Sequence, residues 1–201
     1  MERIRSFIAI ELPPQIRAEL RSLEGKLKAG QHPFVKWVDP GGIHLTLKFL
    51  GGIPATIVPE IVEAMTRTAE QVSPFALQLG GLGVFPNWQR PQVVWVGMGG
   101  EIDKLAGLHR DLETALSSLG FAPESRSFRA HLTLGRLREG ASPKDRQDFA
   151  AWARSIKFES DLSFEVDSLS LMKSQLTPSG AIYTQLASVG LGGQGQRTPF
   201  I

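Results

Sequence analysis

Two histidines in the sequence, His44 and His131, each begin the same tetrapeptide, His-Leu-Thr-Leu. In a strand, alternate residues share a face at a spacing of about 7 Å, so each histidine is expected beside the threonine that follows it, Thr46 or Thr133. The leucines and Phe49 alternate with these residues and are expected to face the core. Each strand would thus present an imidazole and a hydroxyl together on its polar face.

These side chains suit acid–base chemistry at a phosphodiester. Opening a cyclic phosphodiester requires one group that removes a proton from water and another that protonates the departing oxygen. Histidine can do either near neutral pH, because its ordinary pKa is about 6.5. The threonine hydroxyls can hydrogen-bond the non-bridging phosphate oxygens and hold the phosphorus in line between the imidazoles. The arrangement requires no metal ion.

The repetition of the tetrapeptide is what favours function over structure. A single His-x-Thr segment in a strand is weak evidence, since most such histidines are ordinary edge or surface residues. Here two copies stand 87 residues apart in a repeated order of elements. A duplication that preserved only packing explains the leucines, but it does not explain the histidine and threonine on the opposite face. The pair therefore favours catalysis.

The composition is typical of one globular domain. The 201 residues are enough for one substantial core, and the absence of cysteine excludes disulfides, thiolate metal sites and a cysteine nucleophile. No apolar run reaches the roughly 18 residues that a membrane span needs. The first residues alternate like a strand rather than a signal peptide. A net charge of +2 predicts that any contact with nucleic acid is local rather than spread over a broad basic surface.

Hydrophobic periodicity and turn residues predict an α+β fold with mainly antiparallel sheets. Each half runs strand, helix, a strand with His-Leu-Thr-Leu, helix and further strands, so two similar lobes of one domain are expected. We expect that domain to span residues 1–189, followed by a flexible glycine- and glutamine-rich tail at 190–201. The expected helices are 15–28, 56–71, 102–119 and 143–155, and the expected strands are 6–12, 35–38, 43–50, 75–79, 92–96, 130–135, 162–166, 169–173 and 183–189.

Five segments carry a resemblance to a known family: RSFIAIELP, VKWVDPGGIHLTLKFLGG, GVFPNWQRPQVVWVG, RSFRAHLTLGRL and LSLMKSQLTPSGAIYTQL. With them the sequence resembles the bacterial and archaeal RNA 2',3'-cyclic phosphodiesterases, also called 2'-5' RNA ligases, of the 2H phosphoesterase superfamily. Two departures are visible, because Ala130 stands where many relatives have proline and Gly135 where alanine is common. Neither removes a functional group.

The resemblance implies a bilobal 2H phosphoesterase-like fold with an active-site groove between two pseudo-symmetric lobes. It implies hydrolysis of RNA 2',3'-cyclic phosphate ends to 2'-phosphate ends, with His44 as proton donor and His131 as proton acceptor. Thr46 and Thr133 match the hydroxyls that bind the substrate phosphate, and Arg136 matches a basic position that neutralises phosphate charge. Reversible 2'-5' RNA ligation is a further activity that the resemblance implies.

RNA ends with a 2',3'-cyclic phosphate are the expected partner, and tRNA-like fragments are among the candidates. We expect a cytoplasmic monomer that needs no cofactor or metal and binds no membrane. Two alternatives stay open: a non-catalytic protein that binds RNA ends, and a 2H phosphoesterase that acts on small cyclic nucleotides. A two-histidine metal enzyme is a weaker alternative, because no third ligand with suitable spacing is evident.

Other residues carry weaker signals. Lys48 and Arg129 flank the two tetrapeptides and are positioned to attract an RNA backbone, although such residues are usually only solvated. Phe34, Trp37 and Trp88 are candidates to stack on bases, with core packing at least as good an interpretation for each. The two other histidines, at positions 32 and 109, have little functional weight.

Overall fold

The structure, a computed structural model, describes residues 3–125, 127–177, 180–193 and 196–197 of the chain. Its order of strands and helices confirms the predicted α+β class. In chain order the elements are β1 (Arg3–Glu11), α1 (Pro14–Lys28), β2 (Val35–Trp37), the 3-10 turn η1 (Pro40–Gly42), β3 (His44–Pro54), η2 (Ala55–Ile57), α2 (Val58–Ala69), β4 (Phe75–Phe85), β5 (Val93–Gly100), α3 (Ile102–Ser117), β6 (His131–Leu137), α4 (Pro143–Ser155), β7 (Ser163–Val166), β8 (Ser168–Thr177), β9 (Gly180–Gly190), η3 (Leu191–Gly193) and β10 (Gln196–Arg197).

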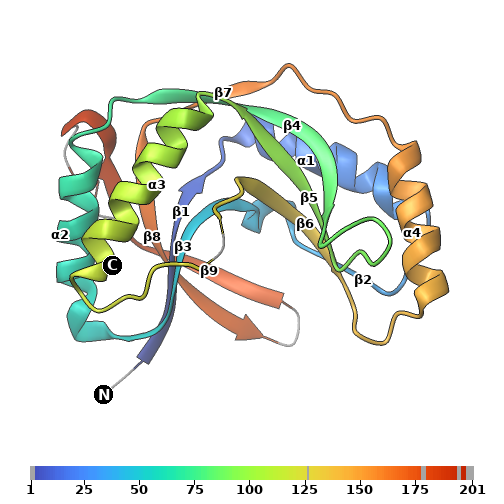
Figure 1. Ribbon diagram of the computed structural model, residues 1–201, viewed down its shortest axis with the longest axis horizontal. Helices are drawn as coiled ribbons and strands as arrows, with labels where there is room; N and C mark the ends of the chain where they lie inside the picture. The colour runs from blue at the N-terminus through green and yellow to red at the C-terminus, as the bar shows by residue number, and fades with distance from the viewer. Residues whose placement is uncertain (1–2, 126, 178–179, 194–195, 198–201) are drawn as a thin grey trace.

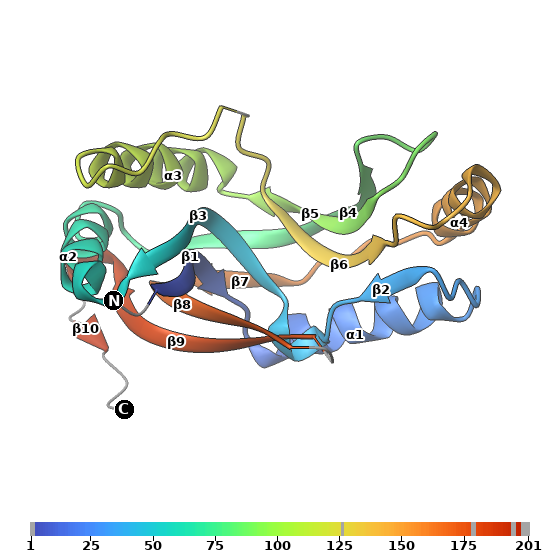
Figure 2. The ribbon, with the colours of Figure 1, turned by 90° about the horizontal axis from the view of Figure 1, so that it is seen from below.

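The strands form two five-stranded sheets, one with the order β10-β9-β8-β1-β3 and the other with the order β2-β6-β5-β4-β7. Every neighbouring pair is antiparallel. Helices α2 and α3 pack side by side at one end of the molecule, and α1 and α4 lie at the other end (Figures 1 and 2). Two lobes, each with an antiparallel sheet and helices, confirm the predicted architecture.

Each sheet draws strands from both halves of the chain, which differs from the expectation of one lobe per half. Strand β2 from the first half pairs with β6, and β8 from the last part of the chain pairs with β1. The strands β3 and β6, which carry the two tetrapeptides, therefore lie in different sheets and contact each other where the sheets meet (Figure 2). The exchange of strands joins the two lobes into one unit.

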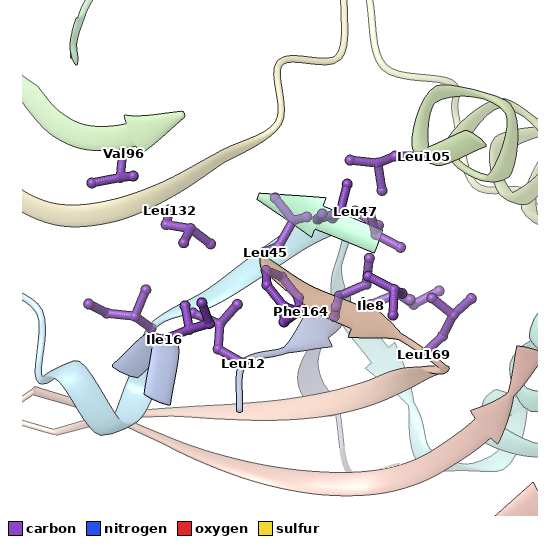
Figure 3. Packing of buried hydrophobic residues seen from close by; sticks show 14 of the residues in the cluster. Ile8, Leu12, Ile16, Leu45, Leu47, Val96, Leu105, Leu132, Phe164 and Leu169 are labelled. Atoms are coloured by element: carbon purple, nitrogen blue, oxygen red, sulfur yellow. The ribbon is translucent and has the colours of Figure 1, made fainter. Parts of the chain in front are cut away.

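One continuous hydrophobic cluster fills the interior and includes residues from both sheets and all four helices. In α1 the apolar residues recur at three- and four-residue steps, and the stripe of Ile16, Leu20, Leu23 and Leu27 is buried as predicted. Leucines of both tetrapeptides lie in the same cluster, as Figure 3 shows for Leu45, Leu47 and Leu132. The core faces of the two motif strands are thereby fixed, and with them the direction of the opposite faces.

Strand β3 contains a bulge just after the threonine of its tetrapeptide. Thr46 pairs with Ala9 of β1, whereas Lys48 pairs with the next residue of β1, Ile8. Leu47 is therefore an extra residue, and the alternation of side chains reverses beyond it. As a consequence Lys48 turns to the core side, where it is 3% exposed.

Strand β6 contains the same bulge at the matching position. Thr133 pairs with Trp95 of β5, whereas Gly135 pairs with Val94, so Leu134 is the extra residue. The two tetrapeptides thus share not only four residues but also the irregularity that follows them.

The bulges correct one prediction and explain another. Phe49 is 58% exposed, so the expectation that it faces the core is wrong. Strict alternation ignored the bulge, which places Phe49 opposite Phe7, on the face of His44. In β6 the same reversal places Arg136 on the face of Thr133 rather than in the core.

The segment after β9 belongs partly to the first sheet. Leu191 is buried, and its amide donates to the carbonyl of Asp167 at 2.7 Å. Strand β10 pairs with β9. The predicted flexible tail at 190–201 thus begins with packed residues, while 194–195 and 198–201 lie outside the described residues, and their flexibility stays a prediction.

Candidate active site

Both motif histidines are anchored in the same way. The Nδ1 atom of His44 lies 2.8 Å from the carbonyl oxygen of Gly42, and the Nδ1 atom of His131 lies 2.6 Å from that of Arg129. A carbonyl oxygen only accepts, so in each ring Nδ1 carries the proton. The Nε2 atom of each neutral imidazole is then an acceptor, and after protonation it is a donor. Each ring is oriented to exchange a proton through Nε2.

The His44 ring contacts two aromatic rings of the first sheet, which also contact each other. It stacks on Phe7, with 4.5 Å between centroids and 23° between planes, and it meets Tyr183 edge-on at 5.0 Å. Phe7 belongs to a small hydrophobic cluster on this side of the sheet, separate from the main core. A side chain at Gly42 would crowd the Tyr183 ring, so a glycine suits the residue that anchors His44.

The His131 ring has aromatic neighbours of a different arrangement. Phe85 meets it edge-on at 4.9 Å, and the Trp95 ring lies 6.2 Å away. Trp95 lies across Gly83, where any Cβ would come within 2.3 Å of the indole. The glycine on β4 is therefore required for the position of the tryptophan beside His131.

The hydroxyls and one guanidinium share the faces of the imidazoles. Thr46 and Thr133 are half-buried, like the two histidines. Arg136 is exposed and pairs with Val93, two residues from the Trp95 that pairs with Thr133. The leucine at the second position of each tetrapeptide is buried on the opposite face, as strand alternation predicts, and the alternation fails only beyond the bulges.

Burial is the main cause that lowers the pKa of both imidazoles below 6.5, and the neighbouring charges differ. At His44 the Gly42 carbonyl and the Glu11 carboxylate oppose this shift, while Arg17 adds to it. At His131 the Arg129 carbonyl opposes the shift, and Arg136 adds to it. At His44 the effect of Glu11 is larger than that of Arg17, so these charges together favour a proton on the ring, whereas the charge of Arg136 disfavours a proton on His131.

Comparison with known families decides what kind of protein carries these features. The model of the family described as LigT like Phosphoesterase matches twice in succession, over residues 10–95 and 96–183. The chain belongs to this family. Each match includes one His-Leu-Thr-Leu tetrapeptide, so the internal repeat predicted from the sequence corresponds to the repeat of the family.

Relatives extend over most of the chain. An RNA 2',3'-cyclic phosphodiesterase of Methanothermobacter thermautotrophicus is 32% identical over 92% of this chain and 97% of its own length. Another, from Aeropyrum pernix, is 34% identical over 81% of this chain and 89% of its own length. The resemblance to this group of hydrolases is therefore confirmed, and the chain is an enzyme of the phosphoesterase class.

Solved structures of the family agree with the fold. A crystal structure of a protein from Thermus thermophilus superposes with a TM-score of 0.79 at 29% identity, covering 96% of this chain and 100% of the other. E. coli LigT in its apo form gives a TM-score of 0.73 at 26% identity, covering 95% and 99%. The same E. coli protein is also known in a complex with 3'-AMP.

Lys48, the residue after the first tetrapeptide, has a structural role. The Nζ atom of Lys48 lies 2.7 and 2.9 Å from the two carboxylate oxygens of Glu113 on α3, and it donates to the carbonyl of Ala122 at 2.7 Å. This buried ion pair ties β3 to α3 and to the segment that leads to β6. Lys48 is therefore not available to attract an RNA backbone, which is the role that its position beside the tetrapeptide had suggested.

The weaker sequence candidates make structural contacts. Phe34, Trp37 and Trp88 all pack against the main core. The His32 ring meets Phe149 edge-on at 5.4 Å, and His109 stacks on a phenylalanine ring at 4.1 Å. These contacts favour the structural interpretation for all five side chains.

The rings that surround the histidines were not predicted from the sequence; they are Phe7, Tyr183, Phe85 and Trp95. Each belongs to a strand, but its proximity to a histidine depends on cross-strand pairing. The one signal in the sequence that could have predicted such a neighbour is the alternation in RSFIAIELP, where Phe7 and Ala9 alternate with isoleucines. This alternation places Phe7 on the face of β1 opposite the core.

Within the described residues, no group of three or more His, Cys, Asp or Glu side chains is arranged to hold a metal ion. None of their helices is both long enough and apolar enough to cross a bilayer.

The structure has two cavities of note. Residues of α2 and β9 line one, and residues of α1 and η1 line the other. Neither lining includes a motif histidine or threonine, so the predicted active-site groove between the lobes stays a prediction.

Proposed function

We propose that this chain hydrolyses the 2',3'-cyclic phosphate at an RNA end. In this mechanism a water oxygen attacks the phosphorus and gives a proton to Nε2 of His131. The bond between phosphorus and the 3' oxygen breaks, and Nε2 of His44 protonates that oxygen. The products are a 2'-phosphate and a free 3' hydroxyl, and the two imidazoles exchange protonation states during the turnover.

The matching anchors of the two rings carry this proposal. A carbonyl two residues upstream holds Nδ1 of each histidine, which leaves the Nε2 atoms of two contacting strands for proton transfer. A structural histidine needs no such repetition. The names of the relatives support cyclic phosphate at an RNA end as the substrate, since they are RNA 2',3'-cyclic phosphodiesterases.

The charges around the rings support the division of roles. Glu11 favours the protonated form of His44, as a proton donor requires, and Arg136 favours the neutral form of His131, as a proton acceptor requires. Binding of an anionic phosphodiester adds negative charge beside both rings and raises both pKa values. His44 can therefore be protonated in the complex although burial lowers its pKa in the free protein.

Thr46 and Thr133 are proposed to donate hydrogen bonds to the non-bridging oxygens. Each lies on the face of its histidine, one from each sheet, so the two hydroxyls approach a phosphate from opposite strands. Arg136 is proposed to add positive charge on the second strand. None of these steps uses a metal ion. We also propose reversible 2'-5' ligation of RNA, by a related transesterification, as a side activity.

The test uses an oligoribonucleotide with a 2',3'-cyclic phosphate end, in buffer with excess chelator. We expect conversion to the 2'-phosphate, which a general phosphatase removes and a 3'-specific phosphatase does not, whereas the unreacted cyclic end resists both. Replacement of either motif histidine by alanine should lower kcat/KM by about 100-fold or more, and the matched control His32→Gln should leave it unchanged. A protein that binds the end without converting it would support the binding alternative, and recovery of lost activity by one divalent ion would support a metal enzyme.

A further inference from the structure

One basic side chain on the second sheet, Lys36, has no role assigned so far, although it lies beside Arg136. Lys36 of β2 pairs directly with Arg136 of β6, and Arg136 pairs with Val93 of β5. Residues directly opposite each other in antiparallel strands point to the same face, so Lys36 shares the face of Arg136. Both side chains are exposed, whereas their neighbours Val35 and Leu137 are buried on the other face.

Two like charges opposite each other across a strand pair repel, which makes this arrangement unfavourable in isolation. Within the described residues, neither Lys36 nor Arg136 has an acidic partner within ion-pair distance. An anion placed between the ammonium and the guanidinium would replace the repulsion by two attractions. The pair has the character of an anion site.

The basic pair of Lys36 and Arg136 lies near the motif residues of β6. Thr133 pairs with Trp95, and Arg136 pairs with Val93, two residues further along β5. Two residues of a strand span about 7 Å, so Arg136 lies about that far along the sheet from the hydroxyl proposed to hold the terminal phosphate, and Lys36 lies one strand further out, about 5 Å to the side. Long, flexible side chains can reach from there to a group one nucleotide away.

We propose that Lys36, together with Arg136, binds the phosphodiester that joins the last two nucleotides of the RNA. This inference rests on the proposed function and narrows its substrate class to chains of at least two nucleotides. A nucleoside 2',3'-cyclic phosphate lacks that phosphate, so it gains nothing from the pair. Lys36 would then be the residue by which the enzyme prefers RNA ends to small cyclic nucleotides.

The test compares three substrates on the wild-type enzyme and on Lys36→Gln. They are uridine 2',3'-cyclic phosphate, the dinucleotide with the same cyclic end, and that dinucleotide with an uncharged methylphosphonate linkage. We expect Lys36→Gln to lower kcat/KM for the charged dinucleotide by about three- to fivefold, the upper part of the range for an exposed ion pair, and to affect the other two substrates less. Lys36→Arg should retain the preference. Lys157→Gln, which removes an exposed lysine between α4 and β7, should not change it.

Salt dependence provides a second measure. Loss of one phosphate contact should make the slope of log kcat/KM against log salt shallower by about 0.7 for the charged dinucleotide. An equal effect of Lys36→Gln on all three substrates, or no effect on any, would overturn the inference. Failure of the wild-type enzyme to convert any of the three would instead overturn the proposed function, so the two failures are distinct.

Discussion

The two motif strands, β3 and β6, are alike up to their bulge and different beyond it. Both begin with His-Leu-Thr-Leu, anchor Nδ1 of the histidine to a carbonyl two residues upstream, and bulge at the second leucine. Beyond the bulge, β3 continues with a buried lysine and an exposed Phe49, and β6 continues with Gly135 and an exposed Arg136. The shared part fits a common task at one phosphate, and the different part makes the two sides unequal.

The residues after the bulge connect each strand to different surroundings. In β3 the lysine bridges to Glu113 on α3. In β6 the matching residue is Gly135, where a Cβ would come within 3.0 Å of the Trp37 ring. One strand is thus held by a buried ion pair and the other by close packing against an aromatic ring. The basic group of β6 is left on the face of His131.

Breaking the buried ion pair should have the largest effect on stability. Lys48→Met leaves the Glu113 carboxylate without its cation and should lower the free energy of unfolding by about 3–5 kcal/mol. The matched control Lys104→Met removes the exposed pair with Glu101 and should cost less than about 1 kcal/mol. Denaturant unfolding measures both.

A double variant sharpens this prediction. Lys48→Met combined with Glu113→Leu removes both charges and should recover much of the lost stability, because an apolar pair of similar volume can replace a buried ion pair. If the single Lys48 variant were no less stable than the Lys104 control, the buried ion pair would not be what holds β3 in place.

The shared hydroxyls should have nearly equal importance. Thr46→Val and Thr133→Val keep the shape and strand propensity of the side chain, and each should cost about 2–4 kcal/mol of transition-state stabilisation, as loss of one preorganised donor does. Steady-state kinetics on a cyclic-phosphate RNA end give this value from kcat/KM. Wild-type rates in both valine variants would mean that the hydroxyls are structural.

The unequal charges should produce smaller shifts of opposite sign. Glu11 raises the pKa of His44, so Glu11→Gln should lower that pKa further. Arg136 lowers the pKa of His131, so Arg136→Gln should raise it. NMR titration of the imidazole C2 protons measures each ring separately, which the coupled limbs of a rate profile do not. Shifts of the same sign in both variants would contradict the proposed asymmetry.

The sequence was sufficient for the features that depend on local alternation. The polar faces of His44 and Thr46 follow from a period of two residues, and the helix stripes follow from a period near 3.6. The burial of Lys48 and the exposure of Phe49 were not predictable in this way, because the bulge depends on pairing with β1. The stacking of His44 on Phe7 has the same origin.

The exchange of strands between the lobes could not be predicted from the sequence, for a related reason. A repeat along the chain predicts two similar units, but it does not say which edge each strand joins. The three-residue β2 joins the second sheet by pairing with β6, which lies in the second half of the chain. Its contribution to the second sheet, and with it the position of Lys36, is visible only in the fold.

The central claim is that His44 donates a proton and His131 accepts one, and a substrate with an activated leaving group tests it most directly. Bis(4-nitrophenyl) phosphate releases nitrophenolate without protonation. His44→Ala should therefore be impaired far less on this substrate than on a cyclic-phosphate RNA end, while His131→Ala should be impaired on both by about 100-fold or more. Rescue of the His131 variant and not of the His44 variant would reverse the roles. A loss of less than about tenfold in both variants on the RNA end would contradict the two-histidine mechanism itself.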